Sequence, residues 1–258
     1  MTHAMRFVAA TLLLTASTTA SAAEWGTLTG RFVLDGKAPT LKPIEATKDQ
    51  ETCSKHVIPN EQLVVDKDGG IANIVVMLKT KNPEVAPSYA DAAKQKVVVD
   101  NKGCRFDPHI AMVLTGQDLE LHNSDPIGHN SKIDPLQNPG INPILPAGGD
   151  PIMHKFSAEE GLPIKIGCNI HPWMGGYIVV RKDPYAAVSD ATGKFTIKDL
   201  PAGKELEFAL WQEDSGYLKN AASKTAKADA RGRFKIKIKP GENDLGDIKV
   251  SRSIFKVK

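Results

Sequence analysis

The sequence predicts an all-β protein. Apolar and polar residues alternate in short runs rich in β-branched side chains from Gly26 onward, and glycine and proline separate these runs. Sustained helical periodicity is scarce. The spacing and composition of the runs are typical of sandwich sheets.

The strands expected in the first two thirds of the chain are short and follow one another closely. They cover residues 27–34, 62–66, 71–79, 96–100, 110–115, 118–123, 152–156, 162–167 and 176–181. Short helices are expected near 87–94 and around 218–227.

The chain changes in character after Asp183. A turn at Thr192 and Gly193 leads into a strand through Phe195, and a second strand runs over 206–211. Two more alternating runs follow, and they occupy residues 233–239 and 247–258. A boundary is therefore expected near 182–186, at the Asp183-Pro184 step.

The first residues have the pattern of a secretory signal peptide. Arg6 precedes an apolar run, and Ala20, Ser21 and Ala22 form an A-x-A cleavage signature. A membrane anchor would need about 18 or more continuous apolar residues, and this run is shorter. We expect cleavage after Ala22, a periplasmic or secreted protein, and no stable membrane insertion.

Charge and motifs narrow the classes of function. The formal net charge of +3 over 258 residues is too weak a bias for nucleic-acid binding. No Ser-His-Asp, paired-carboxylate or phosphate-loop pattern is visible, so we do not expect an enzyme. Modest, mixed charge suits docking on a protein partner.

The chain has three cysteines, Cys53, Cys104 and Cys168. In an oxidising compartment thiols tend to pair or to bind metal, and an odd number means that one differs from the others. Cys168 lies in a loop rich in ligands, which leaves Cys53 and Cys104 free to form a disulfide. The alternative is a second metal site that uses these two cysteines with His56 and His109. The sequence leaves both open, because it does not show whether the backbones approach each other.

The stretch CNIHPWM, residues 168–174, places Cys168, His171 and Met174 on one tight turn. A thiolate, two imidazoles and a weak axial thioether make a blue-copper site. The second imidazole must come from elsewhere, and His129 is the best candidate because Asn130 follows it. The Asn130 amide is expected to bond across to the cysteine loop, and backbone N–H groups near His171 are expected to reach the sulfur.

The other histidines and the competing metal are less favoured. His109, His122 and His154 are expected to be ordinary strand or loop residues. Zinc also binds Cys and His, but a thioether is a poor zinc ligand, so Met174 favours copper. Trp173 fits either core packing or docking of a partner.

Two motifs together resemble the cupredoxin family. FDPHIAMVLTGQDLELHNSDPIGHN and IGCNIHPWMGGYIVV are similar to the His-Asn segment and the closing loop of cupredoxins, and the short loop is the amicyanin-like version. The resemblance covers about residues 96–182. It implies a Greek-key β-sandwich and one type 1 copper, with His129, Cys168 and His171 equatorial and Met174 axial. It also implies electron transfer with a protein partner through the edge of His171.

The sequence departs from the cupredoxin pattern at two places. His122 stands where cupredoxins often carry an aromatic or apolar residue, and a long proline-rich loop fills the region 131–152. Neither departure removes a ligand.

The flanking segments resemble a second family. GTLTGRFVLDGKAP and SDATGKFTIKDLPAGKELEFALWQED are similar to carboxypeptidase regulatory-like, prealbumin-type β-sandwich modules. The expected parts are a signal peptide (1–22), an N-terminal β segment (23–95), a cupredoxin domain (96–182) and a C-terminal β domain (183–258). The two flanks could build one sandwich around the cupredoxin. The whole chain resembles exported composite proteins, some of which are labelled methylamine utilisation proteins.

The expected function is single-electron transfer by a mononuclear copper protein. Multicopper enzymes connect their centres through a histidine adjacent to the cysteine, whereas Gly167 and Asn169 flank Cys168. The alternatives are a periplasmic copper carrier or sensor and a cell-surface binding module without redox turnover.

Overall fold

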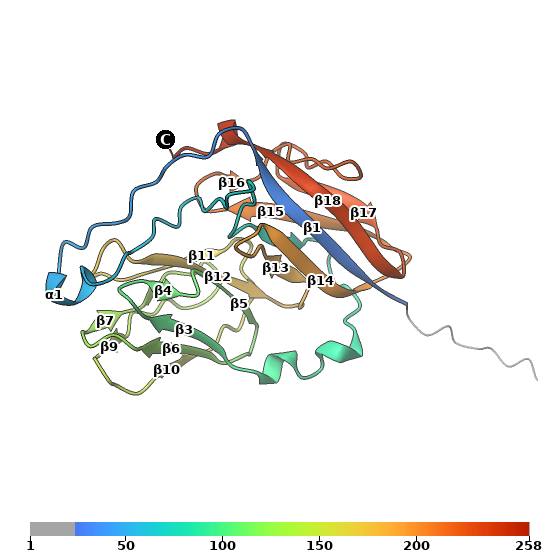
Figure 1. Ribbon diagram of the computed structural model, residues 1–258. Helices are drawn as coiled ribbons and strands as arrows, with labels where there is room; N and C mark the ends of the chain where they lie inside the picture. The colour runs from blue at the N-terminus through green and yellow to red at the C-terminus, as the bar shows by residue number, and fades with distance from the viewer. Residues whose placement is uncertain (1–23, 258) are drawn as a thin grey trace, which may run out of the picture.

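The computed structural model describes residues 24–257 and consists almost entirely of β-strands (Figure 1). The expected signal peptide lies outside the described residues. Within residues 24–257 no helix is long and apolar enough to cross a membrane. In residues 24–257 the strands form four larger sheets and one two-stranded sheet, and the larger sheets are described below in the order in which they pack.

The outer sheet joins the first and last strands of the chain. Its order is β14-β1-β18, with β1 antiparallel to β14 and parallel to β18. These strands are β1 (Trp25–Asp35), β14 (Lys194–Pro201) and β18 (Gly241–Ser251). Every second residue of β1 is buried, as its alternating sequence predicts. At the expected turn before β14, Gly193 has φ +82° and its Cα lies so close to the Phe32 carbonyl that an added Cβ would be 2.5 Å from that oxygen.

The second sheet packs on the outer sheet through one hydrophobic core. Its strands are β13 (Ala186–Val188), β2 (Val75–Leu78), β15 (Glu205–Gln212) and β16 (Gly216–Tyr217), with β17 (Arg233–Lys237) paired to β15. The core contains Phe32 and Val76 from one flank of the chain and Phe195 and Phe208 from the other. Segments that lie on either side of 96–182 in the sequence thus share one interior.

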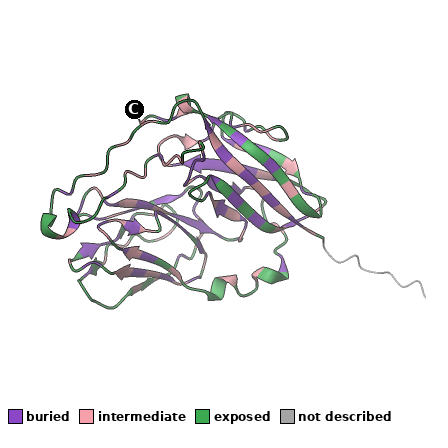
Figure 2. Ribbon diagram, viewed as in Figure 1, coloured by how far each residue is buried: buried purple, intermediate pink, exposed green. Residues whose placement is uncertain are grey.

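Strand β2 is buried on both faces, unlike β1, along which buried and half-buried residues alternate (Figure 2). Val76 and Leu78 point into the core shared with the outer sheet. Val75 and Met77 pack against Val179, which belongs to the third sheet. This explains why the sequence VVML is continuously apolar instead of alternating.

The third and fourth sheets enclose the next core. The third has the order β5-β12-β11-β8 and the fourth has the order β10-β6-β3-β4. Their strands are β3 (Val97–Asn101), β4 (Phe106–Asp107), β5 (Ile110–Leu114), β6 (Leu119–Asn123), β8 (Lys132–Ile133), β10 (Ile152–His154), β11 (Ile164–Gly167) and β12 (Gly175–Arg181). A separate pair, β7 (His129–Asn130) and β9 (Ile144–Leu145), lies at one end of this sandwich. Cys168 and Met174 belong to its buried cluster.

A long excursion between β1 and β2 crosses to this sandwich. It carries the short helix α1 (Gln50–Cys53), which lies in Figure 1 at the same end as β4 and β7. A single backbone bridge between Ile44 and Ile58 closes the base of the excursion. Residues 44–58, which we call the N-terminal cover, pack through Ala46, Cys53 and Ile58 against Cys104.

Several expected elements differ from the structure. No helix forms over 218–227, although the stretch is rich in alanine and lysine, because Asn220 has φ 59° and Ala222 forms two backbone hydrogen bonds with Lys249. Ala221 and Ala228 are drawn into the core instead. The expected strand over 62–66 is reduced to a single bridge between Val65 and Ile71.

Two further elements are shorter than expected. The helix expected near 87–94 is two separate 3₁₀ turns, η1 (Pro87–Tyr89) and η2 (Ala92–Lys94). The run expected to be a strand to the end of the chain leaves β18 after Ser251 and enters the 3₁₀ turn η3 (Arg252–Ile254).

Candidate metal centre

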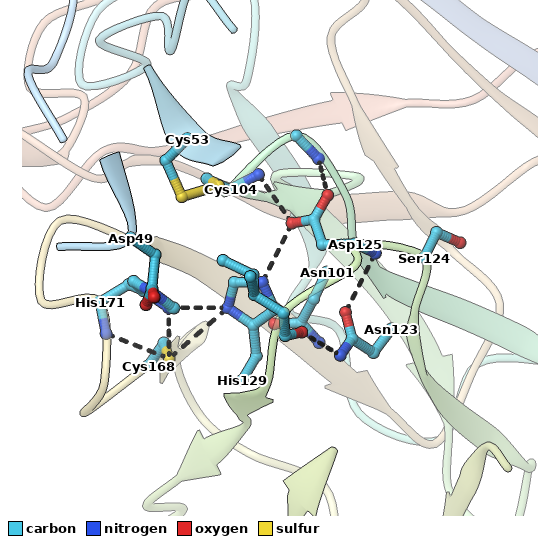
Figure 3. A network of polar contacts seen from close by, with 12 residues as sticks. Asp49, Cys53, Asn101, Cys104, Asn123, Ser124, Asp125, His129, Cys168 and His171 are labelled. Atoms are coloured by element: carbon cyan, nitrogen blue, oxygen red, sulfur yellow. Dashed lines mark hydrogen bonds and ion pairs between the residues drawn. A yellow bond between two sulfur atoms is a disulfide. The ribbon is translucent and has the colours of Figure 1, made fainter. Parts of the chain in front are cut away.

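Three buried donor atoms converge at one end of the third and fourth sheets (Figure 3). The Cys168 Sγ lies 4.0 Å from the His129 Nδ1 and 3.8 Å from the His171 Nδ1. The two Nδ1 atoms are 2.9 Å apart. Within the described residues this is the one group of three or more His, Cys, Asp or Glu side chains close enough to share an ion.

Sheet geometry brings these donors together. His129 lies in β7, while Cys168 and Met174 lie immediately after β11 and immediately before β12. The loop between β11 and β12 is closed by two backbone hydrogen bonds, from the Met174 N–H to the His171 carbonyl (2.9 Å) and from the Cys168 N–H to the Met174 carbonyl (3.3 Å). The antiparallel pair Gly167 and Gly175 forms the base of the loop.

Met174 is buried in the same hydrophobic cluster as Cys168. Its backbone is therefore fixed beside the donor cluster. Its role as an axial ligand stays a prediction.

The surroundings of the Cys168 sulfur favour its thiolate form. It accepts backbone N–H groups from Asn130 (3.5 Å) and His171 (3.4 Å), so the expected N–H donor near His171 is that of His171 itself. Burial by itself would raise the pKa of Cys168, but the hydrogen bonds from His129, Asn130 and His171 outweigh burial and lower the pKa to about 6. Thiolate is the form that binds metal.

The His129 imidazole is held from behind by a carboxylate. Its Nε2 lies 3.0 Å from the Asp125 Oδ2, and Asp125 also accepts the N–H groups of Gly103 (2.6 Å) and Cys104 (2.9 Å). Burial would lower the pKa of His129, but the contacts with Asp125 and Cys168 outweigh burial and raise the pKa to about 9. These hydrogen bonds also hold the pKa of Asp125 low despite the opposing effect of burial. Asp125 therefore orients the Nδ1 of His129 toward the cluster.

The His171 imidazole is also backed by a carboxylate. Its Nε2 lies 2.7 Å from the Asp49 Oδ2, and the side chain of His171 is 0% exposed. The expectation that the edge of His171 faces solvent as the route for electrons is therefore wrong. The physical reason is that the N-terminal cover brings Asp49 over this edge.

Asn130 ties the two ligand segments together as expected. Its Oδ1 accepts the backbone N–H groups of Asn169 (2.8 Å) and Ile170 (3.2 Å) in the cysteine loop. Its Nδ2 donates to the Asn142 Oδ1 at 2.5 Å. One buried amide thus fixes the distance between β7 and the loop after Cys168.

The other two cysteines form a disulfide. Cys53 and Cys104 have an S–S distance of 2.01 Å, and Cys168 is the free cysteine. The alternative metal site with His56 and His109 is therefore not formed. The Nε2 of His109 instead lies 2.7 Å from the Glu213 Oε1.

The remaining candidates lie outside the cluster. The His122 Nε2 is 3.6 Å from the Glu120 Oε2, and the His154 ring packs edge-on against Phe156. Trp173 is half-buried, and its Nε1–H donates to the Cys104 carbonyl at 3.1 Å. Trp173 also packs against the buried cluster that the N-terminal cover forms with Cys104.

Sequence reasoning missed both carboxylates. Asp125 could have been found, since it stands four residues before His129 in the turn SDPIGHN. Asp49 gives no comparable signal, because it is 122 positions from His171 and no motif surrounds it.

The residues present fit a copper ion of the blue type. Two neutral imidazoles and a thiolate are its equatorial donors, and a thioether is its usual weak axial donor. Metal-binding histidines almost always donate the other ring N–H to a carboxylate, carbonyl or water, and His129 and His171 both have a carboxylate in that place. The donor set therefore supports a copper-binding protein.

Comparisons with known proteins give partial likenesses. No family model matches the chain, and no curated protein matches it. The solved structures similar to this chain include cupredoxins.

Three of these structures show how far the identity and the coverage extend. A purple cupredoxin from Nitrosopumilus maritimus is 24% identical over 33% of this chain and 97% of its own, with a TM-score of 0.27. The reduced Cu(I) form of an amicyanin mutant is 20% identical over 41% of this chain and 98% of its own, with a TM-score of 0.30. A copper-containing nitrite reductase from Thermus scotoductus is 25% identical over 33% of this chain and 22% of its own, with a TM-score of 0.30. These likenesses cover between 33% and 41% of this chain.

Proposed function

We propose that this chain is an exported, mononuclear type 1 copper protein that transfers single electrons between protein partners. The observation that carries the proposal is the buried cluster of His129 Nδ1, Cys168 Sγ and His171 Nδ1, whose atoms all lie within 4.8 Å of one another. Met174, buried in the same cluster as Cys168, would supply the fourth, thioether donor. When bound, copper supplies the one-electron Cu(II)/Cu(I) couple.

The residues around the cluster suit electron transfer because they hold the donors in place. Asn130 fixes the cysteine loop, and Asp125 and Asp49 fix the two imidazole rings. Rigid donors change geometry little between oxidation states, which favours electron transfer over bond chemistry. The side chains of His129 and His171 are 0% exposed, so the cluster is also shielded from water.

The proposal does not include an enzymatic reaction. Cys168 is flanked by Gly167 and Asn169, so no adjacent histidine leads from the sulfur to a second metal. The flanking sheets share one core, and we propose that they form a separate sandwich into which the copper-binding part is inserted. The signal-like leader supports a periplasmic or secreted location.

The first test is spectroscopic. The mature protein loaded with Cu(II) should show an intense visible band from thiolate-to-copper charge transfer, and the variant Cys168→Ser should lose it. The variant His122→Gln, which changes a histidine outside the cluster, is the control and should keep the band. A colourless Cu(II) protein, or zinc affinity equal to copper affinity in both the native protein and Met174→Leu, would refute the type 1 assignment.

The second test separates electron transfer from a role as a copper carrier. Carriers exchange metal quickly through open sites, whereas these donors are buried and Asp49 of the N-terminal cover contacts His171. We expect copper to be retained for hours against a chelator while it cycles rapidly and reversibly between oxidation states. Loss within minutes would favour the carrier.

A further inference from the structure

We propose that Asp49 is a positioning residue for the metal centre, which orients His171, covers its edge and lowers the reduction potential. This inference deepens the proposed function and rests on it. The point of departure is the contact between the Asp49 Oδ2 and the His171 Nε2 at 2.7 Å. Asp49 is the only acidic side chain that contacts His171 among the described residues.

The side chain of Asp49 contacts His171 and does not cap the helix that follows it. It is the N-cap residue of α1, where an aspartate normally accepts an N–H of the first turn through its side chain. Here the side chain makes no cap hydrogen bond, and the backbone is left-handed with φ 44° and ψ 43°. Among residues other than glycine, aspartate and asparagine adopt this uncommon conformation most readily. The left-handed backbone directs the carboxylate toward His171.

The N-terminal cover fixes Asp49 in place. The Asp49 carbonyl accepts the N–H groups of Thr52 and Cys53, both at 2.9 Å. Cys53 is bonded to Cys104, and Ala46, Ile58 and Trp173 pack around this disulfide. The cover is therefore anchored to the body of the sandwich within four residues of Asp49.

The disulfide also connects the carboxylates of the two histidines (Figure 3). Cys104 donates its N–H to Asp125, the partner of His129, at 2.9 Å. Cys53, on the other side of the disulfide, donates its N–H to the carbonyl of Asp49, the partner of His171. One covalent link thus positions the groups behind both imidazoles.

The negative charge of Asp49 would stabilise Cu(II) more than Cu(I). A carboxylate behind an imidazole makes the ring more electron-rich and a better ligand. The additional positive charge of Cu(II) benefits more from this than Cu(I) does, so the carboxylate stabilises the oxidised state. The Asp49 side chain is 47% exposed, so solvent screens part of the effect, but the contact itself faces a fully buried ring.

The variant Asp49→Asn isolates the charge. Asparagine tolerates the left-handed backbone and keeps an oxygen that can accept the His171 Nε2–H. We expect Cu(II) affinity to fall about tenfold, the lower end for loss of such a partner. If Cu(I) affinity is unchanged, a tenfold ratio raises the midpoint potential by about 59 mV.

The matched control is Glu51→Gln, which removes the same charge from an exposed residue of the same short helix. It should leave the affinities and the potential unchanged. A second variant, Asp49→Ala, removes both charge and hydrogen bond and should also speed copper loss to a chelator severalfold. Equal potentials for Asp49→Asn, Glu51→Gln and the native protein would overturn the inference.

A metal without redox chemistry separates this inference from the proposed function. Co(II) binding to the same donors, followed by its thiolate absorption, should weaken about tenfold in Asp49→Asn and not in Glu51→Gln. Unchanged Co(II) affinity would refute the positioning role of Asp49. An absent blue band in the native copper protein would refute the type 1 function while leaving the Co(II) result intact.

Discussion

Replacing Asn130 with alanine should loosen the link between the two ligand segments. The Asn130 side chain is buried, and its Oδ1 satisfies the N–H groups of Asn169 and Ile170. In Asn130→Ala both N–H groups lose their partner, but Asn169 is exposed and Ile170 is half-buried, so water replaces part of each lost hydrogen bond. An unsatisfied buried group costs about 1–3 kcal/mol, and the low end of that range for each group lowers the free energy of unfolding of the apo-protein by about 2 kcal/mol.

The variant Asn142→Ala is the control, because it removes a hydrogen bond of the Asn130 side chain without affecting the contacts with the cysteine loop. Asn142 is exposed, and its Oδ1 accepts a hydrogen bond from the Asn130 Nδ2 at 2.5 Å. Its replacement leaves the cysteine loop bonded, and the expected loss is about 1 kcal/mol or less. Urea unfolding of both apo-variants, followed by circular dichroism and fluorescence, measures the difference.

Metal binding provides an independent measurement on the same pair. In Asn130→Ala the cysteine loop loses its side-chain hydrogen bonds to residue 130, and the backbone N–H of that residue is left to hold the Cys168 sulfur, so Cu(II) affinity should fall as well. In Asn142→Ala it should stay close to native. Equal losses of stability and of Cu(II) affinity in the two variants would refute the claim that the contacts of the Asn130 Oδ1 with the cysteine loop stabilise the site.

Three further predictions concern the disulfide and the titrating groups. Cys53→Ala with Cys104→Ala opens a loop with a sequence separation of 51, which should lower the free energy of unfolding by about 4 kcal/mol in urea titrations; a loss below about 1 kcal/mol would contradict this. Because the pKa of His129 is raised to about 9 and that of Cys168 is lowered to about 6, metal must displace one proton between these values, so Cu(II) affinity should rise about tenfold per pH unit from about pH 6 and level off above about pH 9. Calorimetry in buffers of different ionisation heat checks this, and Asp125→Asn should move the plateau to lower pH. Burial opposes the charge on His109, but Glu213 and Glu61 raise its pKa above 6.5, so its contribution to stability is complete below pH 6.5 and lost as the pH rises through the folded-state pKa. His109→Gln should therefore destabilise more at about pH 6 than at about pH 9, and an equal loss at both would count against the ion pairs.

The cluster of donors could be predicted from local sequence because each segment carries its own motif. The spacing of Cys168, His171 and Met174 on one turn and the pair His129-Asn130 are readable without a structure. The strands that hold them, β11 and β12, lie close to their expected bounds. Local alternation suffices there, because each strand is short and its turns are marked by glycine or proline.

Features decided by distant contacts could not be predicted in this way. Asp49 reaches His171 only because a disulfide holds the N-terminal cover against the sandwich, and its immediate neighbours give no sign of it. The same applies to 218–227, where helix propensity yields to backbone pairing of Ala222 with Lys249. A helix-propensity scale depends on the type of residue alone and takes no account of pairing with a strand that is distant in the sequence.

The position of β1 in the middle of the outer sheet determines when each part of the chain can fold. The second half of β1 forms backbone hydrogen bonds with Gly69 and Ile71, but both of its strand partners, β14 and β18, come from the last quarter of the sequence, so its sheet cannot form until most of the chain is present. The strands of the third and fourth sheets, in contrast, follow one another between Val97 and Arg181 and can meet early. Non-local pairing of this kind slows folding. We therefore expect refolding in two phases, in which the metal-binding sandwich forms first and the flanks close around it later.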